Sequence, residues 1–194
     1  MNSKKLLNCI ACGGVNIVEV INFGDQPLAN SFLEERSDNL DTFPLVINYC
    51  NDCTHCQLSI AVDPSLLFAH YLYVSGTTDT LKKHFNEISD TIKNLDNVKN
   101  IINYKNINHV KILDIGSNDN TFLNVLKSNQ FVQLYGVDPA SNINKTNNNG
   151  LNIFSNFWNS KFVKDALVSN KYKFDVITAF NVFAHNLDPE DFMA

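Results

Sequence analysis

Two cysteine pairs, each with two residues between its members, constrain the first third of this chain more than any other feature. They are Cys9-x-x-Cys12 and Cys50-x-x-Cys53. Four thiolates at this spacing can bind one structural zinc ion, with each sulfur about 2.3 Å from the metal. All five cysteines precede residue 57, and in a reducing compartment that usage fits metal binding better than a disulfide framework. We therefore predict a zinc site built from Cys9, Cys12, Cys50 and Cys53.

The second cysteine cluster leaves the ligand set open, because Cys56 follows Cys53 at the same spacing. The second pair of ligands is then either Cys50 with Cys53 or Cys53 with Cys56, and His55 is a further candidate. A free cysteine is commonly a small buried hydrophobe, so we expect Cys56 to be buried and His55 to be a solvated loop residue. A redox-active pair is less expected, because neither pair falls between a strand and a helix of a thioredoxin-like pattern.

The residues around these cysteines predict a small β-rich ribbon over residues 1–65. Strand-like stretches run from Val15 to Phe23 and from Phe43 to Tyr49, and turn signals fall at Gly13-Gly14, Gly24-Asp25 and Asp41. A piece of this size has little core of its own. A bound zinc ion would supply the missing stability.

A connecting part is predicted over residues 66–108. From Asp79 onward, apolar residues recur at helical spacing and form one stripe of an amphipathic helix, at Leu81, Phe85, Ile88, Ile92 and Leu95. The segment from His70 to Thr78 precedes this helix and carries Tyr71 and Tyr73 among hydroxyl residues. Loops between ordered elements often display reactive side chains. From these residues alone, however, we favour the alternative that both tyrosines pack their rings and leave their hydroxyls in water.

The remainder, residues 109–194, reads as part of a doubly wound α/β domain of Rossmann-like type. A buried strand is predicted at 111–115, a tight loop at 116–120, a helix at 121–127 and a second strand at 133–138. The second strand ends in Asp138, about 20 residues beyond Gly116, at the place where an acid binds the two ribose hydroxyls of a nucleoside cofactor. Pro139 would fix the turn that follows.

The loop chemistry favours S-adenosylmethionine over a dinucleotide. A pyrophosphate usually requires a close run of glycines, and this loop has the single glycine Gly116 after Asp114. S-adenosylmethionine carries no phosphates, and its charged amino-acid end can be met by polar residues such as Asn118 and Asp119. The alternative is an ordinary strand-turn-helix that binds no ligand.

Two further strands complete the predicted sheet, at 151–154 and 173–179. The carboxyl ends of parallel strands converge on the ligand crevice. This places Asn156 near the adenine edge, and Asn181 and His185 near the methyl donor. A solvated loop position is the alternative for His185.

Composition excludes some classes of partner. The net charge is −5, and no concentrated basic stripe is present, so nucleic acid is a poor candidate. No apolar run approaches the roughly 20 residues that span a bilayer, and the first residues are too polar for a secretory signal. We expect a soluble, cytoplasmic globular protein that does not bind membranes.

With these residues in view, the chain resembles the sugar C-methyltransferases of deoxysugar biosynthesis, in which a zinc-binding module precedes an S-adenosylmethionine-dependent methyltransferase domain. The resemblance extends nearly from end to end. It rests on a set of motifs in the same order, Cys9-x-x-Cys12, Phe23-Gly-Asp-Gln-Pro-Leu28, Cys50-x-x-Cys53 with Gln57-Leu58, Tyr71-x-Tyr73-x-Ser-Gly76, His84-Phe85, Asp114-Ile-Gly-Ser-Asn-Asp119, Gly136-Val-Asp-Pro139 and Asn181-x-x-x-His185. It favours Cys50 and Cys53 as the second ligand pair.

The resemblance implies a nucleotide-linked 4-keto sugar as substrate, methylated at the carbon next to the ketone. Tyr71, Tyr73 and His185 match the active-site region of the family. The alternatives are methylation at oxygen or of another small molecule, or a non-catalytic zinc-dependent binding module.

Two departures from the family pattern bear on this expectation. Asn120 stands where family members usually carry glycine. This change either tilts the loop or is absorbed without harm, because asparagine tolerates the positive φ that glycine would adopt. The family's sheet has seven strands and a further C-terminal domain follows it, whereas this sequence stops at Ala194 after the fourth strand. We expect a truncated or fragmentary member that is weak or inactive alone. Either a separate chain carries its missing half, or the reading frame continues beyond the present ending.

Overall fold

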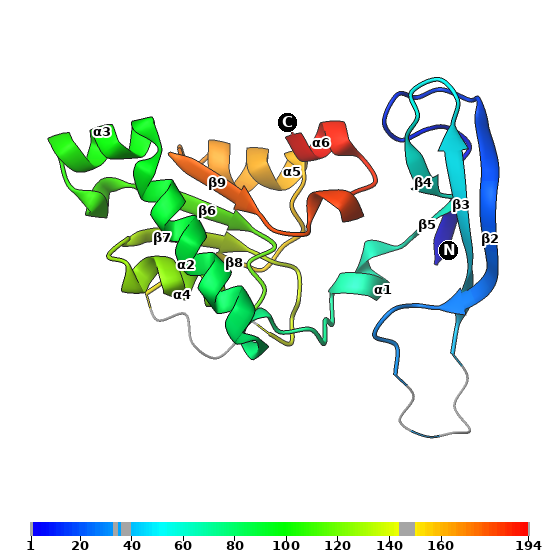
Figure 1. The fold of residues 1–194 in the computed structure, drawn as a ribbon, viewed down its shortest axis with the longest axis horizontal. Helices are drawn as coiled ribbons and strands as arrows, with labels where there is room; N and C mark the ends of the chain where they lie inside the picture. Colours follow the sequence, from blue (N-terminus) through cyan, green and yellow to red (C-terminus); the bar gives the residue numbers. More distant parts are fainter. Residues whose placement is uncertain (1, 33–34, 36–39, 144–149, 194) are drawn as a thin grey trace. The chain divides into compact units, whose positions relative to one another are not determined.

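The computed structural model describes residues 2–32, 35, 40–143 and 150–193. The chain divides into two compact units, shown in Figure 1. The first unit comprises 1–72 with 187–189, and the second comprises 73–186 with 190–194. In the part of the chain that is described, no helix is both long and apolar enough to cross a bilayer.

The first unit is built from short antiparallel strands. Strands β2 (Ile17–Pro27), β3 (Thr42–Cys50) and β4 (Cys56–Leu58) form one sheet, and β1 (Ser3–Lys5) pairs with β5 (Ile60–Val62). A short helix, α1 (Pro64–Phe68), follows, and Asp63 caps it by accepting a 2.9 Å hydrogen bond from the Ser65 backbone N–H.

The sequence correctly predicts the two long strands of this unit but misplaces one turn. Gly24-Asp25 is not a turn, because β2 continues through it, and the register against β3 shifts between Asn22 and Asp25. Gly24 has a φ of 73°. A residue with positive φ inside a strand produces a bulge, which bends the strand without ending it.

The first unit has very little apolar core. Among its described residues, the buried hydrophobic side chains are Cys9, Val46, Cys50 and Ala61. Two of these four are predicted metal ligands. This small core is consistent with a unit that needs a bound metal for its stability.

The second unit has a four-stranded parallel sheet in the order β8-β7-β6-β9. Its strands are β6 (Lys111–Ile115), β7 (Gln133–Val137), β8 (Asn152–Phe154) and β9 (Val176–Ala179). The first of these strands along the chain, β6, therefore lies between the second and the fourth, which is the arrangement of a doubly wound fold. The expected α/β class with a parallel sheet is confirmed.

The fourth strand is shorter than predicted. The expected strand began at Lys173, but β9 begins at Val176. The side chain of Asp175 accepts a 2.8 Å hydrogen bond from the Lys111 backbone N–H, and the Phe174 ring packs against Tyr135. These contacts hold residues 173–175 in an irregular conformation ahead of the strand.

Helices cover both faces of the sheet, as Figure 1 shows. On one face lie α2 (Asp79–Asn94), α3 (Asp96–Tyr104) and α4 (Thr121–Ser128), and on the other lie α5 (Ser160–Phe162) and the π-helical turn η3 (Val163–Val168). The predicted helix from Asp79 is confirmed and packs its stripe into the first core. The remaining short elements are η1 (Ser75–Thr77), η2 (Ile107–His109), η4 (Phe183–His185) and α6 (Pro189–Met193).

Each face has its own hydrophobic cluster, because successive residues of a strand point to opposite faces. Ile112 and Leu134 join the cluster beneath α2 and α4, where the rings of Phe85, Phe122 and Phe180 lie 4.9 to 5.4 Å apart. The cluster beneath α5 and η3 contains Leu113, Ile115, Val137, Phe162, Leu167 and Phe192.

Candidate functional site

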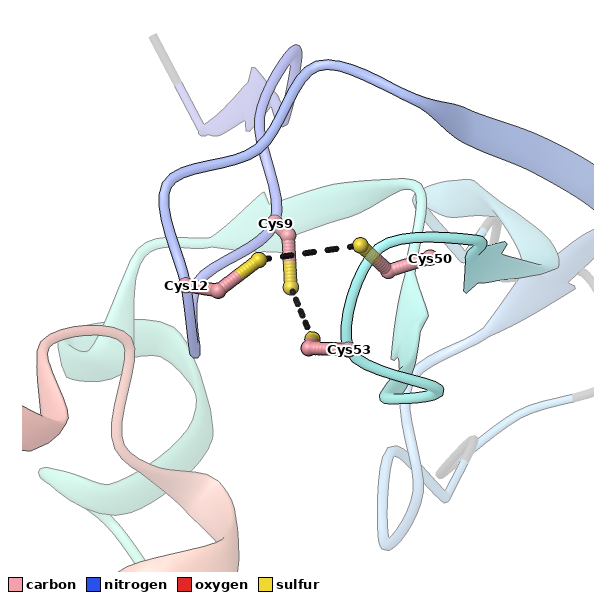
Figure 2. Close-up of side chains that lie close together, drawn as sticks. All are labelled: Cys9, Cys12, Cys50 and Cys53. Atoms are coloured by element: carbon pink, nitrogen blue, oxygen red, sulfur yellow. Dashed lines mark hydrogen bonds between the residues drawn. The ribbon is translucent and has the colours of Figure 1, made fainter.

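Four cysteine side chains come together in the first unit (Figure 2). The sulfur atoms of Cys9, Cys12, Cys50 and Cys53 all lie within 4.8 Å of one another. The Sγ atoms of Cys9 and Cys53 are 3.6 Å apart, and those of Cys12 and Cys50 are 3.7 Å apart. These separations are far too long for disulfide bonds, which require about 2.05 Å.

The cluster fits a tetrahedral zinc ion. Sulfurs placed about 2.3 Å from a central ion at tetrahedral angles are separated by about 3.8 Å from one another. The two Sγ–Sγ distances are close to this value. The donor set of four thiolates is also the one that structural zinc prefers, so these residues would hold the ion as a closed structural site.

Both cysteine pairs are presented by tight turns of the same kind. The Gly13 N–H donates to the Cys9 carbonyl at 2.8 Å, and the Thr54 N–H donates to the Cys50 carbonyl at 2.9 Å. Gly13 has a φ of 73° and Thr54 a φ of 66°. The second turn therefore requires a left-handed conformation from a β-branched residue, which is unfavourable.

Gln57 supports the first turn and was not identified from the sequence. Its side chain is buried, and its Oε1 accepts from the Ile10 N–H at 2.8 Å while its Nε2 donates to the Asn8 carbonyl at 3.0 Å. Cys56, on the neighbouring position of β4, is exposed and lies outside the group of four sulfurs. The expectation that Cys56 is buried is wrong, because alternation along β4 directs Gln57 inward and Cys56 outward.

Replacing Thr54 with glycine is expected to raise the stability of the zinc-loaded first unit by about 1 kcal/mol. Relief of the left-handed strain contributes about 1–2 kcal/mol, and the greater freedom of glycine in the unfolded chain offsets part of it. Denaturant unfolding of the zinc-loaded protein, followed by amide exchange in β3, measures the change. Thr42→Gly, in β3, is the matched control and should lower stability; a Thr54→Gly variant that behaves in the same way contradicts the prediction.

The candidate cofactor site lies at the carboxyl edge of the parallel sheet. After β6 the chain turns at Gly116, whose N–H donates to the Val137 carbonyl at 2.8 Å. Asp138 follows β7 and is buried; its Oδ2 accepts from the Asn118 N–H at 2.9 Å and its Oδ1 from the Ala140 N–H at 2.8 Å. Burial raises the pKa of Asp138 above its ordinary value, although these two hydrogen bonds act in the opposite direction.

Gly116 is required by both its conformation and its surroundings. Its φ is +70°, and a Cβ placed on it would lie 2.4 Å from a methyl carbon of Val182. Residues with a side chain rarely adopt this φ, and the space beside Val182 is too small for a Cβ atom. The turn and the segment after β9 are therefore in close contact.

The substitution Gly116→Ala is expected to cost about 2–3 kcal/mol of unfolding free energy, through left-handed strain together with overpacking against Val182. Denaturant unfolding followed by fluorescence of Trp158, the single tryptophan, measures it. Gly150→Ala is the control, because Gly150 also has a positive φ, of +79°, but a Cβ placed on it would lie at an ordinary contact distance of 3.7 Å from the Lys127 Nζ atom. Equal losses in the two variants would show that contact with Val182 has no effect.

The polar side chains of the loop form hydrogen bonds with other residues of the same chain. Asn118 is buried, and the oxygen and the nitrogen of its side-chain amide both bond to the backbone of residues 73–75. Asp119 accepts from Gly76 N–H at 2.9 Å and from Thr121. Asn120 has a φ of 62°, so it adopts the left-handed conformation that glycine would adopt at this position.

Asp114 lies beneath this loop on the face of α2 and α4. It is buried, and its Oδ1 accepts from the Thr178 hydroxyl at 2.7 Å. Burial raises the pKa of Asp114 to about 7; the Thr178 bond lowers it and the charge of Asp138 raises it further. Thr178 was not identified from the sequence, although it lies directly beside Asp114 in the register of β6 and β9.

The other predicted cofactor residues lie around the same edge. Asn156 is exposed two residues after β8, Pro139 is half-buried after Asp138, and Asn181 is exposed with a φ of 54°. His185 is exposed at the end of η4.

The two predicted tyrosines belong to different units. Tyr73 begins the second unit and is 46% exposed. Tyr71 belongs to the first unit, where its ring centroid lies 5.9 Å from that of Phe68.

The edge has the groups that S-adenosylmethionine needs. The carboxylate of Asp138 accepts two backbone bonds, and its two oxygens offer about four acceptor positions, so capacity remains for a ribose diol. Ser117 is buried in the turn, and its hydroxyl has no hydrogen-bond partner among the described residues. A buried hydroxyl without a partner in this turn, next to Gly136, is consistent with a polar ligand at this edge.

Comparison with known families assigns both units. Residues 9–68 match a family described as "Putative zinc binding domain", and residues 73–194 match one described as "Methyltransferase domain". The second match covers more than half of the chain, so this protein belongs to the methyltransferase domain family. The predicted combination of a zinc-binding module and a methyltransferase domain is confirmed, and the family implies S-adenosylmethionine as the methyl donor.

One curated relative is also similar to the chain. The C-methyltransferase NovU of Streptomyces niveus is 26% identical over 137 residues, which is 70% of this chain. The match covers 30% of NovU.

Proposed function

We propose that this chain binds S-adenosylmethionine at the carboxyl edge of the parallel sheet and serves the C-methylation of a nucleotide-linked 4-keto deoxysugar, at the carbon next to the ketone. The observation that carries the proposal is the buried carboxylate of Asp138, fixed by the backbone N–H groups of Asn118 and Ala140 beside the Gly116 turn. The similarity to a C-methyltransferase supports carbon as the methylated atom.

Within this proposal, Asp138 accepts hydrogen bonds from the ribose hydroxyls. S-adenosylmethionine supplies an electrophilic methyl group on a sulfonium centre. The residues assigned to its binding are Asp114, Gly116, Asn118, Asp119, Asp138, Pro139, Asn156 and Asn181. The functional parts are residues 1–65 for zinc, 66–108 for the tyrosine segment and connecting helix, and 109–194 for the cofactor.

C-methylation next to a ketone requires a base that removes the α-proton and a donor that stabilises the enolate oxygen. We assign these tasks to Tyr71, Tyr73 and His185. The imidazole ring of His185 is suited to accept a proton, and a tyrosine hydroxyl is suited to donate a hydrogen bond to the enolate oxygen. Exposure of Tyr73 and His185 leaves both accessible to a substrate.

Incubation with isotope-labelled S-adenosylmethionine and a 4-keto sugar nucleotide, in the presence of the separate chain expected to complete the sheet, tests the proposal. The expected product carries the labelled methyl group on carbon, as NMR would show, and its formation should fall at least tenfold in His185→Ala. A methyl group attached through oxygen would instead support the alternative of an O-methyltransferase or another small-molecule methyltransferase.

A second candidate is a non-catalytic, zinc-dependent binding module. It is favoured by the loop side chains, because Asn118 and Asp119 bond to residues 73–76 of the chain itself. Calorimetry separates the two: heat of binding with S-adenosylmethionine supports the methyltransferase, and no heat at millimolar ligand with folded protein supports the binding module.

The outer edge of β9 suits a further partner. Among the described strands, β9 pairs with β6 on one side only, and Ile177 on β9 is 54% exposed. We assign this edge to an additional polypeptide, such as a separate chain that carries further strands of the methyltransferase sheet. Co-expression with such a chain should reduce amide exchange in β9; unchanged exchange opposes the assignment.

A further inference from the structure

The segment Tyr73–Gly76 is held against the cofactor loop by three hydrogen bonds from side chains. Asn118 Oδ1 accepts from the Ser75 N–H at 3.0 Å, and Asn118 Nδ2 donates to the Tyr73 carbonyl at 3.0 Å. Asp119 Oδ2 accepts from the Gly76 N–H at 2.9 Å. We call residues 73–76 the tyrosine strap. Two consecutive loop residues therefore bind three positions of its backbone.

The strap also packs tightly on the loop. A Cβ placed on Gly76 would lie 2.6 Å from both Asp119 Oδ2 and the Thr121 hydroxyl. Thr121 fixes Asp119 in turn, through its N–H at 3.1 Å and its hydroxyl at 2.8 Å. The strap can dock in this way only because position 76 lacks a side chain.

Asn118 connects the strap with the acid of the cofactor site. Its backbone N–H donates to Asp138 Oδ2 at 2.9 Å, while its side chain bonds to Tyr73 and Ser75. Asn118 has a φ of 50°, so it makes these two sets of bonds from a left-handed conformation. An amide side chain is suited to the task because it donates and accepts at once, which a carboxylate does not.

We infer that Asn118 is a positioning residue that couples occupancy of the cofactor site at Asp138 to docking of the tyrosine strap, and hence to the placement of Tyr73. A ligand that fixes Asp138 also fixes the backbone of Asn118, which favours the docked strap. Coupling of this kind is reciprocal, so a released strap must weaken the ligand by the same factor. The inference rests on the proposed function, because it takes S-adenosylmethionine as the ligand of Asp138.

Amide hydrogen exchange on the whole protein tests the coupling. Saturating S-adenosylmethionine is expected to slow exchange of the Ser75 and Gly76 amides about tenfold in the wild type. In Asn118→Gly, which keeps the backbone N–H and the left-handed conformation but removes both side-chain bonds, the ligand should no longer slow the Ser75 amide. Calorimetry should show a matching loss of affinity of about tenfold.

Two further variants control the experiment. Lys171→Gly also places glycine at a left-handed position, where Lys171 has a φ of 59°, and should leave the strap and the affinity unchanged. Asn118→Asp keeps the acceptor for Ser75 and loses the donor to Tyr73, so it should give an intermediate result and serves if Asn118→Gly fails to fold.

The outcomes distinguish the inference from the function on which it rests. No heat of binding to the wild type overturns both. Binding that leaves exchange of Ser75 and Gly76 unchanged, or unaltered affinity in Asn118→Gly, overturns the coupling alone and leaves the proposed cofactor site intact.

Discussion

Removal of zinc by a chelator, or the substitution Cys50→Ser, is expected to unfold the first unit and leave the second unit folded. The first unit has four buried hydrophobic side chains among its described residues, and two of them belong to the cysteine cluster. Structural zinc contributes about 10–16 kcal/mol in small zinc-binding peptides, which is as large as the whole stability of a typical domain. Amide hydrogen exchange measures both units at once. The backbone amides of β3 should lose their protection from exchange, and those of β6 should keep it.

The substitution Cys56→Ser is the matched control. Cys56 is a neighbouring cysteine on β4 that lies outside the group of four sulfurs. We expect this variant to bind one zinc ion, measured by mass spectrometry under native conditions, and to keep protection in β3. A Cys56→Ser variant that loses zinc, or a Cys50→Ser variant that keeps its structure, would contradict the assignment of the ligands.

The sequence predicts the cofactor half well because its signals are local. The run at 111–115 is apolar and short, as expected of a strand buried on both faces, and β6 has these same bounds. The helix at 121–127 and the strand at 133–138 are each confirmed to within one residue. Each prediction depends on residues that are adjacent along the chain.

Contacts between distant segments could not be predicted in this way. Gln57 bonds to backbone groups 47 and 49 residues earlier, and Asn118 bonds to groups 43 and 45 residues earlier. The sequence shows that both residues are polar and near a candidate site, but not which way their amides point. Their partners are backbone atoms, which every residue type presents alike.

The same limit explains the misplaced turn in the first unit. Gly24-Asp25 is a common turn sequence, and the local pattern predicts a reversal there. Pairing with β3 on both sides of the pair keeps the chain extended and converts the expected turn into a bulge. Sheet contacts made elsewhere decide between the two outcomes.

The stability of the second unit is expected to fall by about 4 kcal/mol between pH 4 and pH 8 because of Asp114, and Asp114→Asn should remove that dependence. Burial raises the pKa of Asp114 from 3.8 to about 7. The folded state therefore holds a proton that the unfolded state has released, so the contribution is fully present below about pH 4 and is lost as pH rises through about 7. Three pKa units at about 1.4 kcal/mol each give the stated size.

Asparagine keeps an acceptor for the Thr178 hydroxyl but cannot ionise, so the comparison isolates the charge. Denaturant unfolding followed by Trp158 fluorescence at pH 4, 6 and 8 gives the free energy of unfolding of each variant. Asp90→Asn serves as the control, because the Asp90 side chain is 72% exposed and its loss should leave the dependence on pH unchanged. If Asp114→Asn retains the wild-type dependence, then Asp114 is already ionised in the folded protein at low pH, and its burial beneath the cofactor loop would have to be offset by a positive group or by solvent that reaches the carboxylate.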